Sequence, residues 1–347
     1  MACAMHSILE THSPPDATAR GRSPLLELEE LSVTFATPRG PVDAVRELTL
    51  SIREGECVGI VGESGAGKSQ ALLAVMGLLG RNARVGGRAR FEGSDLLGAD
   101  ERVLNGVRGS RLAMIFQDPM TSLTPHLRIG RQIAESLAQH RGMSGRAARD
   151  RALELLQRVH IADAARRLDQ YPHQLSGGMR QRAMIAIALA CDPALLIADE
   201  PTTALDVTVQ AQILALLAEL KRERGMSMVL ITHDFGVVAG LADRVAVMYG
   251  GRLVELGPTR AVLQSPAHPY TQALLRSMPR IDDAREGPFS AVRGQPPNPR
   301  ALPPGCAFHP RCEHTADRCR RERPLLAPHG ASLAACHFPL ALGRQTL

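Results

Sequence analysis

Alternation of apolar and polar residues predicts β-strands in the first part of the chain. Residues 26–35 follow this pattern, residues 44–52 repeat it, and a turn containing Pro and Gly at 37–41 separates the two. The next apolar run, 56–61, is short and continuous, as expected of a buried strand. A Gly-rich loop follows, and a helix is predicted over 70–79. The chain is therefore expected to begin with strands and to continue into a strand–loop–helix unit.

Helical spacing of apolar residues dominates the region 118–175. Within it, the clearest patterns cover residues 130–140 and 145–160. Farther along, two short apolar runs flank a longer helical pattern, in the order 194–198, 207–224 and 228–231. Alternating strands and helices are typical of a parallel sheet covered by helices. The fold class is therefore predicted to be α/β.

Both ends of the chain depart from this pattern. Residues 1–24 are polar, contain prolines and are expected to form a flexible tail. After residue 265 the composition shifts toward Pro, Arg, His and Cys, and the six prolines between 287 and 305 predict an irregular, extended segment. We find neither a signal peptide nor a run of the roughly 18 apolar residues that a spanning helix needs. These features predict a soluble, cytoplasmic chain whose contact with a membrane would depend on a partner.

Composition and charge argue against a protein that binds nucleic acid. The chain has 347 residues, which suggests about two domains, and it carries a net charge of +6. Aromatic residues make up 3% and Trp is absent, which argues against a stacking platform for single-stranded nucleic acid. The positive charge forms no dense block, so we expect no nucleic-acid partner. Only Lys68 and Lys221 are lysines among 41 basic residues, so a retained lysine suggests a need for a compact ammonium group.

Residues 62–69 fit the pattern of a phosphate-binding loop: Gly, four residues, then Gly-Lys-Ser. Glycines let backbone N–H groups curl around a phosphate, and the helix that begins near Lys68 points its positive end at the same anion. Lys68 would bridge the β- and γ-phosphates, and Ser69 would offer a hydroxyl to Mg²⁺. The alternative is a chance Gly-rich turn, but the strand before it and the helix after it argue against that. The predicted nucleotide-binding residues here are Gly62, Glu63, Ser64, Gly65, Ala66, Gly67, Lys68, Ser69 and Gln70.

A second apolar strand ends in two carboxylates, Asp199 and Glu200. Ligands gather at the carboxyl ends of strands in open α/β sheets. We expect Asp199 to hold Mg²⁺, directly or through water, and Glu200 to polarise the attacking water. Together with the phosphate loop, this pair predicts an enzyme that binds MgATP and hydrolyses it.

The segment 175–181, Leu-Ser-Gly-Gly-Met-Arg-Gln, carries the most specific resemblance. By itself it predicts a helix N-cap at Ser176, followed by glycines whose N–H groups are open to an anion. It resembles the signature sequence of the ATP-binding cassette (ABC) ATPases. Other motifs stand in that family's order: Gln117 resembles the Q-loop glutamine, Asp206 lies in a segment like the D-loop, and His233 resembles the switch histidine.

The resemblance covers about residues 25–265 and implies a P-loop NTPase (RecA-like) core with an antiparallel β subdomain. It also implies a helical subdomain at about 118–178, and leaves 266–347 as an irregular extension that contains four cysteines. Two such domains are expected to face head to tail, so that the signature of one subunit contacts the nucleotide held by the other.

The same resemblance assigns roles to single residues. It makes Gln117 a further residue at the Mg²⁺ site, beside Ser69 and Asp199. Phe35 is expected to stack on adenine, although the turn at 37–41 lengthens the loop behind it. The implied catalytic residues are Glu200, His233 and Gln117, and the implied contacts to nucleotide outside the phosphate loop are Phe35, Ser176, Gly177, Gly178 and Asp206.

Longer phrases resemble the oligopeptide/dipeptide importer branch of the family. They include Tyr-Pro-His-Gln-Leu-Ser-Gly-Gly-Met from residue 171, His-Pro-Tyr-Thr-Gln-Ala-Leu-Leu from residue 268 and Gly-Cys-Ala-Phe-His-Pro-Arg-Cys from residue 305. That branch implies a second, usually different ATPase subunit, two membrane permeases and an extracytoplasmic binding protein. It also implies a peripheral location on the cytoplasmic face of a bacterial inner membrane.

Other functions stay open at this point. Peptide is the expected cargo, with nickel, a metallophore or glutathione as alternatives, because permeases and binding protein choose it. An ABC ATPase acting on nucleic acid or ribosomes is a competing class, but its members join two cassettes or insert a long coiled coil. Here one cassette is found, with 108 positions from Lys68 to Ser176. Exporters usually fuse membrane helices to the cassette. Import direction, and whether the partner ATPase is another copy, rest on resemblance.

Four late cysteines form a separate group, with five, six and sixteen residues between neighbours: Cys306, Cys312, Cys319 and Cys336. Four thiolates can hold a [4Fe–4S] cluster, and members of the resembled branch are similar here. Zinc is the competitor because histidines lie nearby, although zinc sites prefer two to four residues between paired cysteines. Metal-free thiols are the third alternative, and disulfides are not expected in the cytosol.

Overall fold

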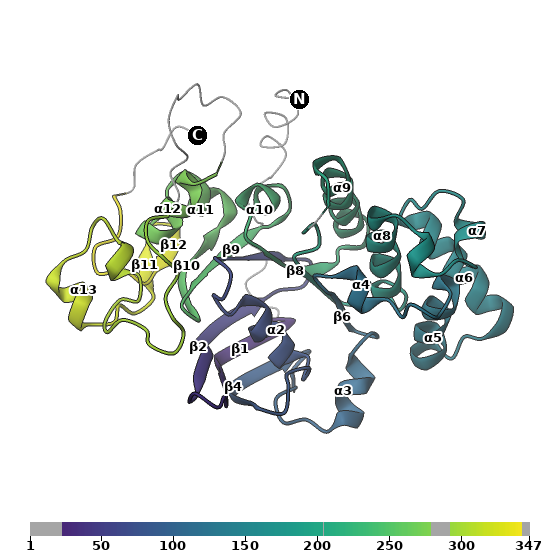
Figure 1. The fold of residues 1–347 in the computed structure, drawn as a ribbon, viewed down its shortest axis with the longest axis horizontal. Helices are drawn as coiled ribbons and strands as arrows, with labels where there is room; N and C mark the ends of the chain where they lie inside the picture. The colour runs from purple at the N-terminus through teal and green to yellow at the C-terminus, as the bar shows by residue number, and fades with distance from the viewer. Residues whose placement is uncertain (1–22, 204, 279–291, 342–347) are drawn as a thin grey trace.

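The computed structural model describes residues 23–203, 205–278 and 292–341 (Figure 1). Most of the predicted N-terminal tail and residues 287–291 of the proline-rich segment lie outside these ranges. Residues 292–305 contain neither helix nor strand, as predicted. In the described parts of the chain, no helix is both long and apolar enough to cross a membrane.

The smaller sheet is antiparallel, with strand order β2-β1-β4-β5. Burial alternates along β1 because its leucines and valines face the core while its polar residues face outward. The Pro- and Gly-containing turn joins β1 to β2, as predicted from the sequence. The strands are β1 (Leu26–Phe35), β2 (Val42–Ile52), β4 (Ala83–Phe91) and β5 (Ser94–Asp95).

The larger sheet has eight strands in the order β11-β12-β10-β9-β3-β8-β7-β6. Five neighbouring strands of this sheet, β9, β3, β8, β7 and β6, are parallel. The three inner strands β3, β8 and β7 are buried, as expected of strands that are continuous apolar runs in the sequence. The strands are β3 (Cys57–Val61), β6 (Leu112–Ile115), β7 (Leu195–Asp199), β8 (Ser227–Thr232), β9 (Arg244–Tyr249), β10 (Arg252–Pro258), β11 (Ala327–His329) and β12 (Ser332–Ala334).

Helices lie on both faces of this sheet and in an arm at its β6 edge (Figure 1). Helix α2 lies between the two sheets, α9 and α10 cover the other face, and α4 to α8 form the arm. This arm corresponds to the predicted helical region. The helices are α2 (Lys68–Val75), α3 (Glu101–Val107), α4 (Pro119–Ser122), α5 (Ile129–Arg141), α6 (Gly145–Arg158), α7 (Ala164–Arg167), η2 (Pro172–Gln174), α8 (Gly177–Ala188), α9 (Val207–Arg224) and α10 (Phe235–Leu241).

The expected end of the helix after the phosphate loop was wrong. The sequence predicted a helix to residue 79, whereas α2 ends at Val75. Gly77 has a φ of +61°, a left-handed conformation that ends helices and that glycine adopts without strain. The apolar residues after it continue the hydrophobic pattern but not the helix.

The C-terminal extension is more ordered than its composition suggested. Strand β12 pairs with β10, and β11 pairs with β12, so the extension adds two strands to the large sheet. The buried Glu255 in β10 accepts hydrogen bonds from the backbone N–H groups of Ala267 (2.8 Å) and His268 (2.9 Å), which fixes the start of the extension. Helix α11 (Thr259–Gln264) ends just before the extension, whose own helices are α12 (Pro269–Arg276), η3 (His309–Arg311) and α13 (Asp317–Arg321).

Candidate active site

The phosphate loop connects β3 to α2 and needs glycine at both of its ends. A Cβ atom at Gly62 would lie 2.3 Å from the carbonyl oxygen of Met248, and one at Gly67 would lie 2.2 Å from that of Ala44. Gly65, with a φ of +81°, has open space beside it. Packing therefore fixes the loop ends, while the middle of the loop leaves its backbone open to a ligand such as a phosphate.

Lys68 is folded back onto this loop. Its side chain is buried, and its Nζ donates hydrogen bonds to the carbonyl oxygens of Gly62 (2.6 Å) and Glu63 (3.1 Å). Burial lowers the pKa of Lys68, while the carboxylates of Glu200 and Asp199 oppose that shift. The result is a poorly hydrated ammonium group beside open backbone, which suits binding of a phosphate.

Ser69 and Asp199 place two oxygen ligands side by side. The Ser69 hydroxyl donates a hydrogen bond of 2.8 Å to Oδ1 of Asp199, which is the last residue of β7. Burial raises the pKa of Asp199, although the bond from Ser69 lowers it. A hydroxyl and a carboxylate are oxygen donors of the kind Mg²⁺ prefers, so these residues fit the predicted ion.

Three side chains surround the carboxylate of Glu200: those of Gln117 and His233, which the sequence predicted for the site, and that of Thr203. Its carboxylate accepts hydrogen bonds from Gln117 Nε2 (3.3 Å) and from Thr203 Oγ1 (2.8 Å), and His233 Nδ1 lies 3.5 Å away. Its φ of +46° is unusual for a residue with a side chain, and its N–H donates to the carbonyl oxygen of Ile231 (2.9 Å). A strained backbone that tertiary contacts hold in place is typical of functional sites.

The signature segment lies elsewhere in the molecule. Ser176 caps α8 and accepts a hydrogen bond from the N–H of Met179 (3.4 Å), as its sequence predicted. Gly178 lies against Val209, because a Cβ atom there would come within 2.7 Å of that side chain. Asp206 caps α9 and accepts from the N–H of Val209 (2.9 Å). The structure thus brings the signature and D-loop residues together, and no hydrogen bond among the described residues joins Ser176, Gly177 or Gly178 to the phosphate loop.

Phe35 lies at the end of β1, opposite Val42 in β2. Two residues beyond Val42, the carbonyl oxygen of Ala44 borders Gly67 of the phosphate loop. The antiparallel sheet therefore brings the Phe35 end of β1 toward the phosphate loop.

Sequence reasoning missed several residues that hold the site. Thr203 bonds to Glu200, and both Tyr270 and Arg311 bond to Glu63. The sequence had singled out the phrases around Tyr270 and Arg311 only as signs of a family branch. Their distance along the chain from the phosphate loop left no local pattern that could reveal the contacts.

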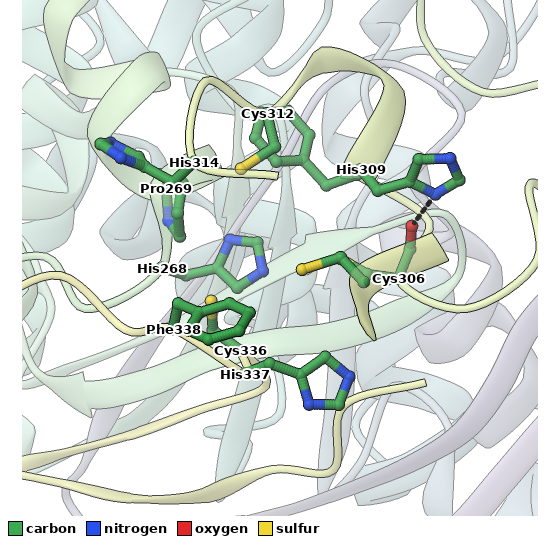
Figure 2. Close-up of a pocket in the computed structure, with 11 residues that line it drawn as sticks. His268, Pro269, Cys306, His309, Cys312, His314, Cys336, His337 and Phe338 are labelled. Carbon is green, nitrogen blue, oxygen red and sulfur yellow. Dashed lines mark hydrogen bonds between the residues drawn. The ribbon is translucent and has the colours of Figure 1, made fainter. Parts of the chain in front are cut away.

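The four late cysteines line one small cavity in the extension, together with His268 and Phe308. Figure 2 shows the side chains of Cys306, Cys312 and Cys336 turned toward the same central space. Burial raises the pKa of these three thiols, to about 11 for Cys336, and the neighbouring cysteines add to the shift. Within the described residues, no three His, Cys, Asp or Glu side chains lie close enough together to hold a metal ion.

Comparison with known proteins identifies the family. The family model described as ABC transporter matches residues 45–203, and the one described as oligopeptide/dipeptide transporter, C-terminal region, matches residues 254–319. The chain is 52% identical to the oligopeptide transport ATP-binding protein OppD of Salmonella typhimurium, with 91% of this chain and 94% of that protein covered. The chain belongs to the ABC transporter family. It is an ATPase of that family, and ATP with Mg²⁺ is its implied substrate and ion.

Two further matches support the family and the fold. OppD of Escherichia coli is 50% identical, covering 96% of this chain and 98% of that protein. Among solved structures, a dimeric ATP-binding cassette in a post-hydrolysis state, bound to ADP and phosphate, is 32% identical with a TM-score of 0.61. The match covers 68% of this chain and 99% of the solved cassette, so the cassette corresponds to only part of this chain.

Proposed function

We propose that this ATPase drives uptake of oligopeptides or dipeptides through membrane permeases. The observation that supports this most strongly is the similarity over nearly the whole length, extension included, to proteins named for oligopeptide transport. The model for the oligopeptide/dipeptide transporter C-terminal region also covers residues 254–319, outside the general ABC match. The two OppD relatives are about 50% identical to this chain over a range that includes both the ATPase core and the extension.

The phosphate loop and the residues around it support assignments for MgATP binding. The backbone N–H groups of Ser64, Gly65 and Gly67 hold the β-phosphate. Lys68, held by the carbonyl oxygens of Gly62 and Glu63, directs its ammonium group to the β- and γ-phosphates. Ser69, Asp199 and Gln117 would hold Mg²⁺. When bound, Mg²⁺ neutralises charge on the phosphate oxygens.

Glu200 is the proposed general base. It accepts a proton from the attacking water at its carboxylate, while Thr203 and Gln117 keep that carboxylate in place through the hydrogen bonds described above. His233 lies beside Glu200 and is exposed, so it is available to the γ-phosphate oxygens. Most of the catalytic effect in phosphoryl transfer comes from positioning and charge, which this cluster supplies.

The proposed catalytic unit contains two ATPase subunits. Ser176, Gly177 and Gly178 present a helix N-terminus to the nucleotide of a facing subunit, and Asp206 lies at the same surface. Phe35 stacks on adenine from the antiparallel sheet. A second ATPase subunit, two permeases and an extracytoplasmic binding protein complete the assembly, on the cytoplasmic face of the bacterial inner membrane. Residues 25–265 form its ATPase domain and 266–347 its transporter-type extension.

Two substitutions test the nucleotide site. Glu200→Gln should retain MgATP binding and lose nearly all hydrolysis, because the amide cannot accept a proton. Lys68→Ala should lose nucleotide affinity, because no other ammonium replaces it. Binding is measured by calorimetry on the purified chain and turnover by phosphate release in the assembled complex. Normal turnover of Glu200→Gln would remove Glu200 as the base, and unchanged affinity of Lys68→Ala would refute the phosphate-loop assignment.

Cargo is tested in vesicles that contain this ATPase, its partner ATPase and the permeases. Peptide-loaded binding protein should stimulate ATP hydrolysis and uptake of labelled peptide, and both should be lost with Lys68→Ala. Nickel, a metallophore and glutathione are the matched alternative cargoes. Stimulation by one of these and not by peptide would replace the peptide assignment, and co-purification with ribosomes in place of permeases would overturn transport itself.

We further propose that the cysteine cavity holds a [4Fe–4S] cluster. Four thiols around one cavity fit its ligand number, and a cluster of four irons is wider than a single zinc ion, which gathers its donors within about 2.3 Å. When bound, the cluster would lie in the extension. Anaerobic purification should yield about four irons per chain, and Cys336→Ser should lower the iron content. Iron-free protein, or stoichiometric zinc, would rule the cluster out.

A further inference from the structure

Glu63, the second residue of the phosphate loop, is held at both ends by the C-terminal extension. Its carboxylate accepts two hydrogen bonds from the Arg311 guanidinium, at 2.6 Å from Nη1 and 2.9 Å from Nη2. Its backbone N–H donates to the hydroxyl of Tyr270 at 2.9 Å. Two positions far along the chain, one in η3 and one in α12, thus meet at a single loop residue.

Arg311 is fixed by its own surroundings. Its side chain is only 5% exposed, and its Nε donates to the carbonyl oxygen of Arg293 at 2.7 Å. The guanidinium also lies 5.8 Å from the ring centre of Tyr249 and 5.9 Å from that of Phe308. The bond to Glu63 raises the pKa of Arg311, so its charge stays in place. A planar, two-bonded guanidinium–carboxylate pair defines the orientation of both partners.

Holding Glu63 also holds the groups that face the nucleotide. The carbonyl oxygen of Glu63 accepts one of the two hydrogen bonds of Lys68 Nζ. Glu63 also follows Gly62, whose carbonyl oxygen accepts the other. A loop that is ordered before the ligand arrives avoids the entropy loss of ordering it during binding. Freeing Glu63 from Arg311 would therefore loosen the position of Lys68.

We propose that Arg311 is a positioning residue of the phosphate loop, through which the extension holds the nucleotide site in its binding conformation. This inference rests on the proposed role of the loop in nucleotide binding. Arg311 acts through Glu63 and does not contact the nucleotide. The extension is thereby part of the nucleotide site and more than an appended domain.

A double-mutant cycle tests the coupling, with MgADP as the probe and calorimetry on the full-length chain. Arg311→Met should raise the Kd for MgADP about tenfold, and Glu63→Gln should have an effect of similar size. The double variant should be no weaker than the more affected single variant, because both changes remove the same pair. Arg311→Lys keeps the charge but not the two-bonded geometry, and should fall between wild type and Arg311→Met.

Controls separate this effect from a folding defect and from failure of the site itself. Arg293→Ala removes an exposed side chain that pairs with Glu313 in the same extension and should leave the Kd unchanged. Wild-type affinity in Arg311→Met, or multiplication of the two single effects in the double variant, would overturn the inference. Should Lys68→Ala bind as wild type does, the nucleotide assignment itself is wrong. Loss of binding in Lys68→Ala with none in Arg311→Met would refute the positioning role alone.

Discussion

At the scale of single residues, Thr203 is a neighbour outside the recognised motifs that orients the proposed general base, Glu200. Its hydroxyl donates a hydrogen bond of 2.8 Å to the Glu200 carboxylate, whose backbone is already strained at a φ of +46°. As the proposed general base, the Glu200 carboxylate would need a fixed direction to accept a proton from water. Thr203 and Gln117 bond to the same oxygen, which leaves Oε1 for water and His233.

Thr203→Val should therefore lower ATP hydrolysis in the assembled complex roughly tenfold, since a hydrogen bond to a charged group contributes about 1.5–3 kcal/mol. Valine preserves the branched shape but donates no hydrogen bond. Affinity for MgADP should stay at the wild-type value, because Thr203 does not take part in the phosphate loop. Thr203→Ser keeps the hydroxyl and should restore most of the rate; equal rates in Thr203→Val and wild type would contradict the role.

The sequence could predict those site residues whose partners are close in the chain or whose motif is local. Lys68 begins the helix that follows one strand-forming run, and Glu200 directly follows another, so both stand in local patterns that the sequence displays. The Arg311–Glu63 pair joins positions 248 residues apart. Nothing near either residue indicates the other, because only the packing of the extension against β9 and the phosphate loop brings them together.

At the scale of elements, the contact between β3 and α10 depends on the absence of a side chain. Gly59 lies in the middle of β3, between β8 and β9. A Cβ atom there would lie 2.8 Å from Cγ1 of Val238 and 3.3 Å from Cβ of Ala242. Helix α10 can therefore cross close over the strand that leads into the phosphate loop.

Gly59→Ala should destabilise the protein by about 1–3 kcal/mol, because the added methyl group overpacks a stiff, β-branched neighbour. Urea unfolding followed by circular dichroism measures the change. Gly240→Ala is the matched control: it lies on the exposed side of α10 with open space around it, and alanine favours a helix by about 0.8–1.0 kcal/mol over glycine. Equal stabilities of the two variants would show that the crossing of α10 over β3 tolerates a methyl group at residue 59.

The long helix α9 and the continuous apolar strands β3, β7 and β8 were predictable from the sequence, whereas the shortest strands were not. The helical pattern at 207–224 coincides with α9, because eighteen residues give several turns of periodicity. Strands β11 and β12 are three residues each, too short to show an alternation, and they form only because β10 offers a paired edge. Helix α2 ends earlier than its apolar pattern predicted, because the backbone of Gly77 is left-handed.

At the scale of the whole molecule, the phosphate loop and the signature occupy separate places. The loop lies between the two sheets near α2, whereas α8 begins in the helical arm beyond the β6 edge (Figure 1). Ser176 and Gly177 are exposed at the N-terminus of a twelve-residue helix. The similar solved cassette with bound ADP and phosphate is described as dimeric. An exposed helix N-terminus of this kind is suited to an anion that another subunit supplies.

Ser176→Arg should therefore separate binding from turnover. In the proposed arrangement of two subunits, the arginine would occupy the space of the facing subunit's γ-phosphate, so hydrolysis in the assembled complex should fall about tenfold or more. The purified chain should bind MgADP as wild type does, because its own phosphate loop is intact. Ser144→Arg provides the control, since Ser144 is an exposed N-cap of α6 with no capping hydrogen bond, and both quantities should stay unchanged. Weaker binding by the isolated Ser176→Arg chain would mean that the signature contacts the nucleotide of its own subunit, and an unchanged rate in the complex would mean that it contacts none.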